Sequence, residues 1–432
     1  MPSEIGGECE AGDILYIYDS DLERFGCIAD RKGEHWMFRY VFKLLNVALG
    51  QINAAAEKKQ GAALIPPAGF SDLSPKTAAQ KPNAANIPDS EYQNRTDLTE
   101  FTVPEGVQSI GSDAFRDCSN LQKITLPETL LEIGSRAFLR CSALTEIVIP
   151  DSVRKIGNDA FSDCIRLRSF RFPKGMNGAE LEHGILHHCA ALETVELPNR
   201  LTGPFDDVFS RCSSLRTVRM PEGITEIGSF AFYGCKRLEH IEIPSTVTSL
   251  EHRAFQGCES LREIVIPDTV KTIDGEKVFM HCANLESIRL PVGVTFRLER
   301  DEDDDDEENV KSVAECFSGC NALKTVILGR RKFRLQGTLD DNTLLFMRAE
   351  LAASGDKTAQ ELTAQDIDTA LWLLIQASRT ETAAALLRCY GEDVLTKEVL
   401  QSAIDAAGMI GREDILRMLR EYCAGRNMGE NT

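Results

Sequence analysis

The side chains with the most obvious capacity for chemistry form a short histidine cluster. His183 and His187 are four residues apart, and His188 and Cys189 follow directly. A spacing of four can place two histidines on one face of a helix, where they could bind a metal ion. The surrounding pattern favours a structural role, because His188 stands at a variable position and Cys189 at a position that recurs along the chain. We therefore predict no metal ion and no cofactor here.

Two further groups of polar side chains fail as catalytic or metal-binding motifs. The acidic run Asp301–Glu308 begins like a calcium loop, but Asp306 replaces the required glycine and Ser312 the closing glutamate. We expect a solvated, disordered loop; the alternatives are docking of a basic partner or weak binding of divalent cations. Cys316-x-x-x-Cys320 lacks the redox spacing Cys-x-x-Cys.

Sequence motifs of common enzyme classes are also missing. The chain has no glycine-rich phosphate loop, no Gly-x-Ser-x-Gly elbow and no His-Glu-x-x-His motif. We identify no catalytic residues and predict that the protein is not an enzyme.

A repeat provides the elements that must position these side chains. Each copy reads Phe-x-x-Cys-x-x-Leu-x-x-Ile-x-Leu-Pro, and Val-x-x-Ile-Gly-x-x-Ala leads into the next phenylalanine. The repeat cysteines are Cys118, Cys141, Cys164, Cys189, Cys212, Cys235, Cys258, Cys282 and Cys320. Their spacing is 23 to 25 residues, with a last interval of 38, which is the range of leucine-rich repeats. A constant period predicts a solenoid, which usually offers a long surface rather than a catalytic cleft.

The copy Phe115–Pro127 shows how each turn is expected to fold. Ile124 and Leu126 alternate with Lys123 and Thr125, which predicts a short parallel strand with its apolar side chains inward. Proline ends the strand because it has no N–H for the ladder. The Val-x-x-Ile-Gly stretch then gives a second extended segment. We expect the Ala-Phe-x-x-Cys stretch to form a tight helical turn.

Stacked turns should align equivalent side chains in columns. The aromatic column is Phe115, Phe138, Phe161, Leu186, Phe209, Phe232, Phe255, Phe279 and Phe317. Equivalent cysteines should lie about 4.8 Å apart, beyond the Cβ separation of about 3.5–4.5 Å that a disulfide needs. We predict free, buried thiols that fill space as small apolar groups. Irregular structure is expected around the degenerate copies at Leu186 and Phe209.

The outward column of the strands is the candidate binding site. It consists of Thr102, Thr125, Val148, Arg171, Glu196, Arg219, Glu242, Val265, Arg289 and Ile327. Charges alternate in sign through Arg171, Glu196, Arg219 and Glu242. One interpretation is a ladder of neighbouring ion pairs that neutralises the concave face, each pair contributing a few tenths of a kcal/mol. The other is a mixed-charge surface on which these four residues bind another protein.

The full phrase Ile-Gly-x-x-Ala-Phe-x-x-Cys-x-x-Leu-x-x-Ile-x-Leu-Pro resembles the BspA-like leucine-rich-repeat family. Ile110–Pro127, Ile133–Pro150, Ile156–Pro173 and Ile227–Pro244 carry it most fully, and the resemblance covers about half of the chain. It implies a leucine-rich-repeat solenoid with a parallel concave sheet. The family includes bacterial surface adhesins that bind host matrix proteins and other bacteria, so the resemblance implies an adhesin as an alternative to a scaffold.

Charge and hydropathy exclude several partners. The net charge of −19 argues against nucleic acid, which requires basic surfaces, and no apolar run is long enough for a membrane span. The first residues do not show a secretory pattern. We expect a cytoplasmic protein, with the cell surface or secretion as the alternative.

The predicted organisation is an α/β repeat protein with four regions. These are a small α+β or helical head (1–59), a flexible Pro/Ala-rich linker (60–96), the solenoid (97–329, acidic insertion 298–310) and an α-helical domain (330–432). Helices are expected near residues 342–353, 367–377, 381–390, 397–407 and 413–422. The last four resemble two degenerate ankyrin-type pairs. In the head, residues 13–18 and 25–29 are expected to be partner strands.

Overall fold

The structure is a computed structural model that describes residues 16–19, 24–27, 85–274, 277–297 and 313–425. The chain divides into two units, Met1–Ala79 and Gln80–Thr432. In the first unit, β1 (Tyr16–Asp19) pairs with β2 (Arg24–Cys27) as antiparallel strands. This agrees with the two partner strands expected in the head. The acidic run lies outside the described residues.

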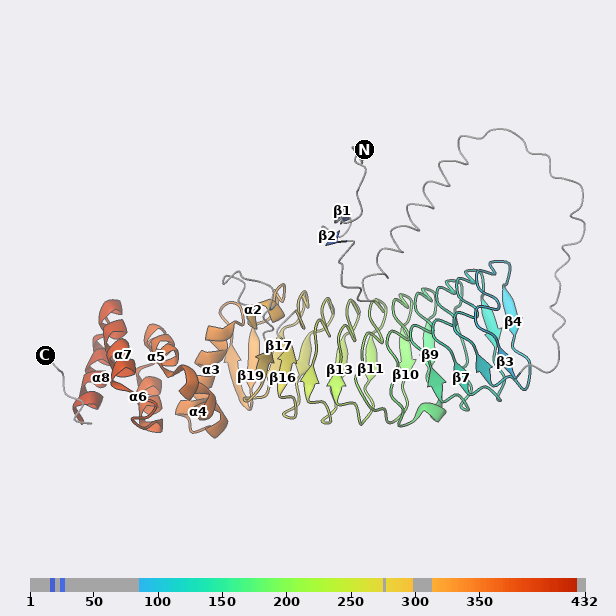
Figure 1. Cartoon of the computed structure of the whole chain (residues 1–432). Helices are drawn as coiled ribbons and strands as arrows, with labels where there is room; N and C mark the ends of the chain where they lie inside the picture. The colour runs from blue at the N-terminus through green and yellow to red at the C-terminus, as the bar shows by residue number, and fades with distance from the viewer. Residues whose placement is uncertain (1–15, 20–23, 28–84, 275–276, 298–312, 426–432) are drawn as a thin grey trace, which may run out of the picture. The chain divides into compact units, whose positions relative to one another are not determined.

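The second unit contains a solenoid whose turns carry up to two short strands each (Figure 1), and the described residues 146–150 carry none. The strands of the Ile-x-Leu-Pro segments are β4 (Glu100–Thr102), β6 (Lys123–Thr125), β9 (Ser169–Arg171), β10 (Thr194–Glu196), β11 (Thr217–Arg219), β13 (His240–Glu242), β15 (Glu263–Val265), β17 (Ser287–Leu290) and β19 (Thr325–Leu328). The second set is β3 (Asn86–Ile87), β5 (Ser109–Ile110), β7 (Glu132–Ile133), β8 (Lys155–Ile156), β12 (Glu226–Ile227), β14 (Ser249–Leu250), β16 (Thr272–Asp274) and β18 (Thr295–Arg297).

Strand register confirms the predicted inward and outward faces. In the parallel pair β4–β6, Phe101 lies opposite Ile124 and Thr102 opposite Thr125. Ile124 is buried, whereas Lys123 and Thr125 are exposed. The stack begins before residue 97, because β3 already pairs in parallel with β5. The solenoid therefore includes residues that the sequence assigned to the linker.

The aromatic column is the centre of the core. Phe115, Phe138, Phe232 and Phe255 are fully buried. The Phe115 and Phe138 rings stack with centroids 5.3 Å apart and 4° between planes, and the Phe232 and Phe255 rings with 5.4 Å and 5°. Burying each such ring contributes about 1.5–3 kcal/mol, and each needs the neighbouring turn to cover it.

The helical turn expected at Ala-Phe-x-x-Cys is wrong for most repeats. This segment forms consecutive tight turns, and the residue before the cysteine has positive φ, as in Asp117 (58°) and Arg140 (61°). The turns are joined to the next repeat by backbone bonds, such as the Phe115 N–H to the Ala137 carbonyl at 2.7 Å. A helix would use these groups internally, so stacking favours the open turn. In the last repeat a helix, α2 (Val313–Cys316), precedes Phe317, and residues 317–319 again form a turn.

The fourth and fifth repeats are irregular, as expected. Between β8 and β12 the second set of strands is replaced by isolated bridges, among them Glu180–Thr202 and Pro204–Glu226. A 3-10 helix, η1 (Lys174–Met176), follows β9.

The solenoid ends in an antiparallel strand, β20 (Arg331–Arg334), which pairs with β19. Helices follow: α3 (Asp341–Ala353), α4 (Lys357–Thr363), η2 (Ala364–Asp366), α5 (Ile367–Gln376), α6 (Thr380–Cys389), α7 (Lys397–Ile410) and α8 (Glu413–Gly425). The five predicted helices are confirmed, whereas the sequence analysis missed α4. In α3, Arg348 donates to the carbonyls of Val292 and Val294, which ties the helices to the last turns. No helix in the described ranges has the length and apolarity needed to cross a membrane.

Candidate protein-binding surface

The strands of the Ile-x-Leu-Pro segments form four short sheets, and we call the surface made by the outward side chains of these segments the strand face. Strand pairing places Arg171 of β9 beside Glu196 of β10, and Arg219 of β11 beside Glu242 of β13. Glu196, Arg219 and Glu242 are exposed, and Arg171 is half-buried. The structure thus brings the four predicted residues into two neighbouring pairs, one on β9 and β10 and one on β11 and β13.

The charges in this column do not neutralise one another. Arg171 donates from Nη1 to Asp151 Oδ1 at 2.6 Å. Glu242 lies 3.7 Å from His240 Nε2. Glu196 and Arg219 have no ion-pair partner among the residues that the structure describes. The expected ladder of neighbouring Arg–Glu pairs is therefore not formed.

Other charged columns of the same solenoid do form pairs between turns. Arg136 Nη2 lies 2.8 Å from Asp113 Oδ2, and Arg216 Nη1 lies 2.7 Å from Glu239 Oε1. These partners are separated by one repeat, so the spacing of the turns permits such contacts. The lack of ion-pair partners for Glu196 and Arg219 among the described residues therefore reflects the particular sequence of the strand face.

Exposed apolar side chains flank the charged part of the strand face. Val148 is 74% exposed and Val265 is 54% exposed. Both occupy the outward column that contains Arg171 and Glu242. Apolar positions on either side of unpaired charges match the composition of protein interfaces, in which apolar contacts combine with oriented polar groups.

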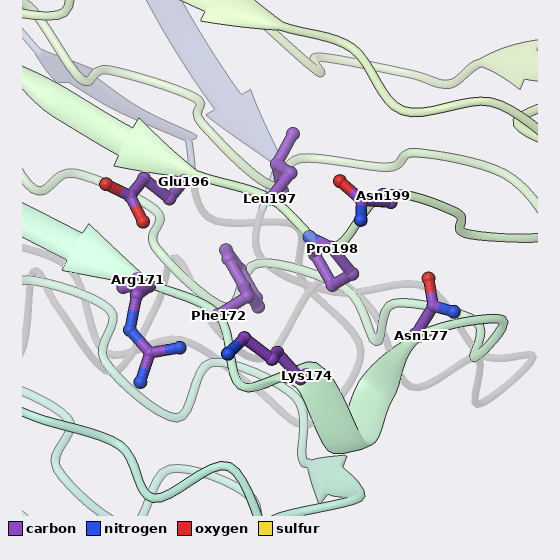
Figure 2. A pocket seen from close by; sticks show the side chains of 8 residues that line it. All are labelled: Arg171, Phe172, Lys174, Asn177, Glu196, Leu197, Pro198 and Asn199. Carbon is purple, nitrogen blue, oxygen red and sulfur yellow. The ribbon is translucent and has the colours of Figure 1, made fainter.

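A pocket of ≈ 340 Å³ opens beside Arg171 and Glu196 (Figure 2). Its lining is Arg171, Phe172, Lys174, Asn177, Glu196, Leu197, Pro198 and Asn199. The pocket lies where η1 lengthens the turn after β9. The sequence analysis missed Lys174, Asn177 and Asn199; the spacing of 25 residues between Cys164 and Cys189 was the available signal.

Asp151 fixes one wall of this pocket. Its carboxylate accepts from Arg171 and from the Lys174 backbone N–H at 3.2 Å, and lies 3.3 Å from Lys174 Nζ. Hydrogen bonding to Arg171, with the Lys174 N–H next, lowers the pKa of Asp151 to about 2. Arg171 and Lys174 are thereby neutralised in part, whereas Glu196, beside Arg171 on the adjacent strand, has no ion-pair partner in the described part of the chain.

The sequence profile of the BspA type leucine rich repeat region matches residues 85–203 and 179–298, in six copies. These are the turns whose strands and aromatic column are described above. The repeat region belongs to this family.

Solved structures of leucine-rich repeat proteins resemble parts of the chain. A leucine-rich repeat protein from Bacteroides ovatus has 27% identity and a TM-score of 0.48, over 56% of this chain and 58% of that protein. A leucine rich cell surface protein from Faecalibacterium prausnitzii has 25% identity and a TM-score of 0.30, over 56% and 82%. A T. pallidum leucine-rich repeat protein has 28% identity and a TM-score of 0.30, over 41% and 71%. A search of curated protein sequences returned no match.

The histidine cluster lies in the fourth BspA-type repeat. His187 Nδ1 is 2.9 Å from Asp207 Oδ2, and His183 Nε2 is 3.8 Å from the same oxygen. His188 Nδ1 is 2.6 Å from Asp163 Oδ1. These contacts join carboxylates of adjacent repeats to the rings. Within the described ranges, no group of three His, Cys, Asp or Glu side chains is arranged to hold a metal ion.

The repeat cysteines do more than fill space. Each thiol donates to a backbone carbonyl of the preceding turn, for example Cys141 to Phe115 at 3.2 Å and Cys235 to Phe209 at 3.1 Å. Burial raises the pKa of the Cys118 thiol to about 11 and that of Cys141 well above its ordinary value. The column is structural, because its thiols are protonated donors inside the core.

Proposed function

We propose that this chain is a non-enzymatic interaction scaffold that binds another protein through the strand face. The observation that carries the proposal is the contrast between charged columns: Arg136 and Arg216 pair across turns, whereas Glu196 and Arg219 are exposed and have no ion-pair partner among the residues described. Solvated charges on a long, rigid surface can be satisfied by complementary charges on a partner, which gives specificity and fast association. The pocket beside Glu196 adds a recess for a partner side chain.

Charge reversal on the strand face tests this proposal. A photo-crosslinking residue at position 148 should capture the partner from extract of the source cells, and mass spectrometry should identify it. With the purified partner, Arg219→Glu should weaken binding by about tenfold or more, as expected for a central interface arginine. Arg237→Glu is the matched control, because Arg237 is exposed outside the strands. Equal affinities of wild-type protein and Arg219→Glu would reject the strand face as the binding surface.

The cellular compartment is part of the same proposal. We place the scaffold in the cytoplasm, which the buried free thiols support, since reducing compartments preserve them. The match of the repeat region to the BspA-type family supports a second candidate function, a surface or secreted adhesin that binds host or bacterial proteins. Protease treatment of intact source cells separates the two. Protection until lysis would support the cytoplasmic scaffold, and rapid digestion beside an intact cytoplasmic marker would support the adhesin.

A further inference from the structure

A basic segment interrupts the acidic composition at the end of the solenoid. Residues 316–339 contain Lys324, Arg330, Arg331, Lys332 and Arg334, and no Asp or Glu. The whole chain has a net charge of −19. Four of these five cations lie on β20 or at its start.

β20 has an open hydrogen-bonding edge. In the described part of the chain, β20 pairs with β19 and is the last strand of its sheet. The Leu335 N–H donates to the Lys324 carbonyl at 2.9 Å, and bonded pairs alternate in an antiparallel ladder. Arg331, Phe333 and Leu335 therefore direct their backbone groups to β19. The N–H and C=O groups of Lys332 and Arg334 point to the open edge.

The side chains along this edge are available for binding. Lys332 and Arg334 are exposed, and neither has an ion-pair partner among the described residues. Arg331 differs, because its Nη2 lies 2.6 Å from Glu350 Oε2. Register places Lys332 beside Ile327 and Arg334 beside Thr325. The side chains of Lys332 and Arg334 consequently extend the strand face. Phe333 lies half-buried on the other side of the strand, and the Arg331 guanidinium is 5.2 Å from its ring centroid.

We propose that β20 is a docking edge for an extended acidic segment of a partner protein, which adds to the sheet as one more strand. Addition to a sheet edge combines backbone hydrogen bonds with side-chain selection at every second position. Acidic residues of the added strand would lie beside Lys332 and Arg334, within about 4.5–5.5 Å between Cβ atoms. Residues between them would face Phe333. The ligand is thus a strand that alternates Asp or Glu with apolar residues.

Basic residues on an edge strand also have a protective role, because they discourage pairing between sheets. If Lys332 and Arg334 only protect the edge, no strand should bind to it. Their contribution to the binding of any anionic ligand should then depend on charge alone. Docking predicts that binding also depends on the alternation of the ligand and on its backbone N–H groups. These requirements can be separated with synthetic peptides.

The probe is a fluorescein-labelled acetyl-Glu-Val-Glu-Val-Glu-Val-Glu-amide, titrated with the full-length protein and followed by fluorescence anisotropy. The first control peptide has the same composition with its four glutamates together, and the second has alternate backbone amides N-methylated. We expect saturable binding of the first peptide and at least about tenfold weaker binding of both controls.

The protein variants test the edge itself. Lys332→Glu with Arg334→Glu should weaken binding of the alternating peptide by about tenfold or more. The matched pair is Lys271→Glu with Arg237→Glu, which changes the net charge equally at exposed positions off the strand face and away from β20 and should leave affinity within about twofold. Circular dichroism confirms that each variant is folded.

Three outcomes would overturn the proposal. They are no saturable binding of the alternating peptide, equal binding of the N-methylated peptide, and equal losses in the two variant pairs. Binding of a single-stranded oligonucleotide as tightly as the alternating peptide would also overturn it, because the edge would then act as a patch of charge. Loss of peptide binding with intact binding through the strand face would separate this site from the function proposed above.

Discussion

Raising the pH should unfold the solenoid through its thiol column. Nine described cysteines are buried: Cys118, Cys141, Cys164, Cys189, Cys212, Cys235, Cys258, Cys282 and Cys316. Burial raises the pKa of every one of these thiols above the ordinary value of 9.0. The protonated thiol is retained in the folded protein, and all of these thiols except Cys316 donate to a carbonyl of the preceding turn. In the unfolded chain, each thiol loses its proton at the ordinary cysteine pKa.

The sign and size of the effect follow from linkage. A pKa raised by folding gives stability that is fully present below pH 9.0 and is lost as the pH rises toward the native value. Above pH 9.0, each thiol lowers the free energy of unfolding by about 1.4 kcal/mol per pH unit, and nine thiols together lower it by about 12 kcal/mol per pH unit. This loss is comparable with the whole free energy of unfolding of a typical domain, about 5–15 kcal/mol. For Cys118 the loss ends near pH 11, its native pKa.

Urea denaturation followed by circular dichroism measures this loss. We expect a constant midpoint below about pH 8.5 and a steep fall by about pH 10, with a reducing agent present throughout. Replacing Cys164, Cys189 and Cys212 by serine keeps a hydroxyl donor but removes three titrating groups. The slope of unfolding free energy against pH should then decrease by about a third, or about 4 kcal/mol per pH unit. A midpoint that stays constant to about pH 10, or an unchanged slope in the triple variant, would refute the reasoning.

Two further predictions concern the stacking of the turns, and chemical denaturation checks both. Phe232→Ala should lower the free energy of unfolding by about 3–5 kcal/mol, because a fully buried ring is removed from the aromatic column; Val265→Ala, at an exposed position, should change it by less than about 0.5 kcal/mol. Gly134→Ala should cost about 1–3 kcal/mol, because the new Cβ would lie 2.7 Å from the carbonyl carbon of Gly111 in the adjacent turn. Gly337→Ala meets no atom within 4 Å, so equal losses at both glycines would contradict the packing argument.

The features that could be predicted from the sequence are those that recur in every copy of the repeat. Alternation in Lys123–Thr125 predicts which side chains are buried because a strand has a period of two. The aromatic column follows from one phenylalanine per copy, and five helices follow from apolar spacing. The helix α4 was missed because its seven residues bury little more than Ala359 and Thr363, which leaves a weak apolar pattern.

The remaining features depend on contacts between turns, which a single copy does not show. The tight turn at Ala-Phe-x-x-Cys resembles a helix in sequence, yet its N–H groups bond to the next repeat, as Phe115 does with Ala137. The donor role of the thiols depends on the same offset between turns, because the acceptor of Cys141 is the carbonyl of Phe115. The strand face shows the limit most clearly, because sequence placed Arg171 beside Glu196 and could not show that Arg171 bonds to Asp151.

This last contact changes the argument about function. If stacking alone decided the pairing, Arg171 and Glu196 would neutralise each other, since register makes them neighbours. Arg171 instead bonds to Asp151, which directly follows Pro150 in the preceding repeat, and the Glu196 carboxylate has no ion-pair partner among the described residues. An exposed charge that is solvated by water lowers the stability of the free protein very little. Folding stability alone therefore does not require Glu196 to form an ion pair. If the strand face binds the partner as proposed, complementary charges of that partner pair with Glu196 and Arg219, and Glu196→Lys in the partner assay should weaken binding as Arg219→Glu does.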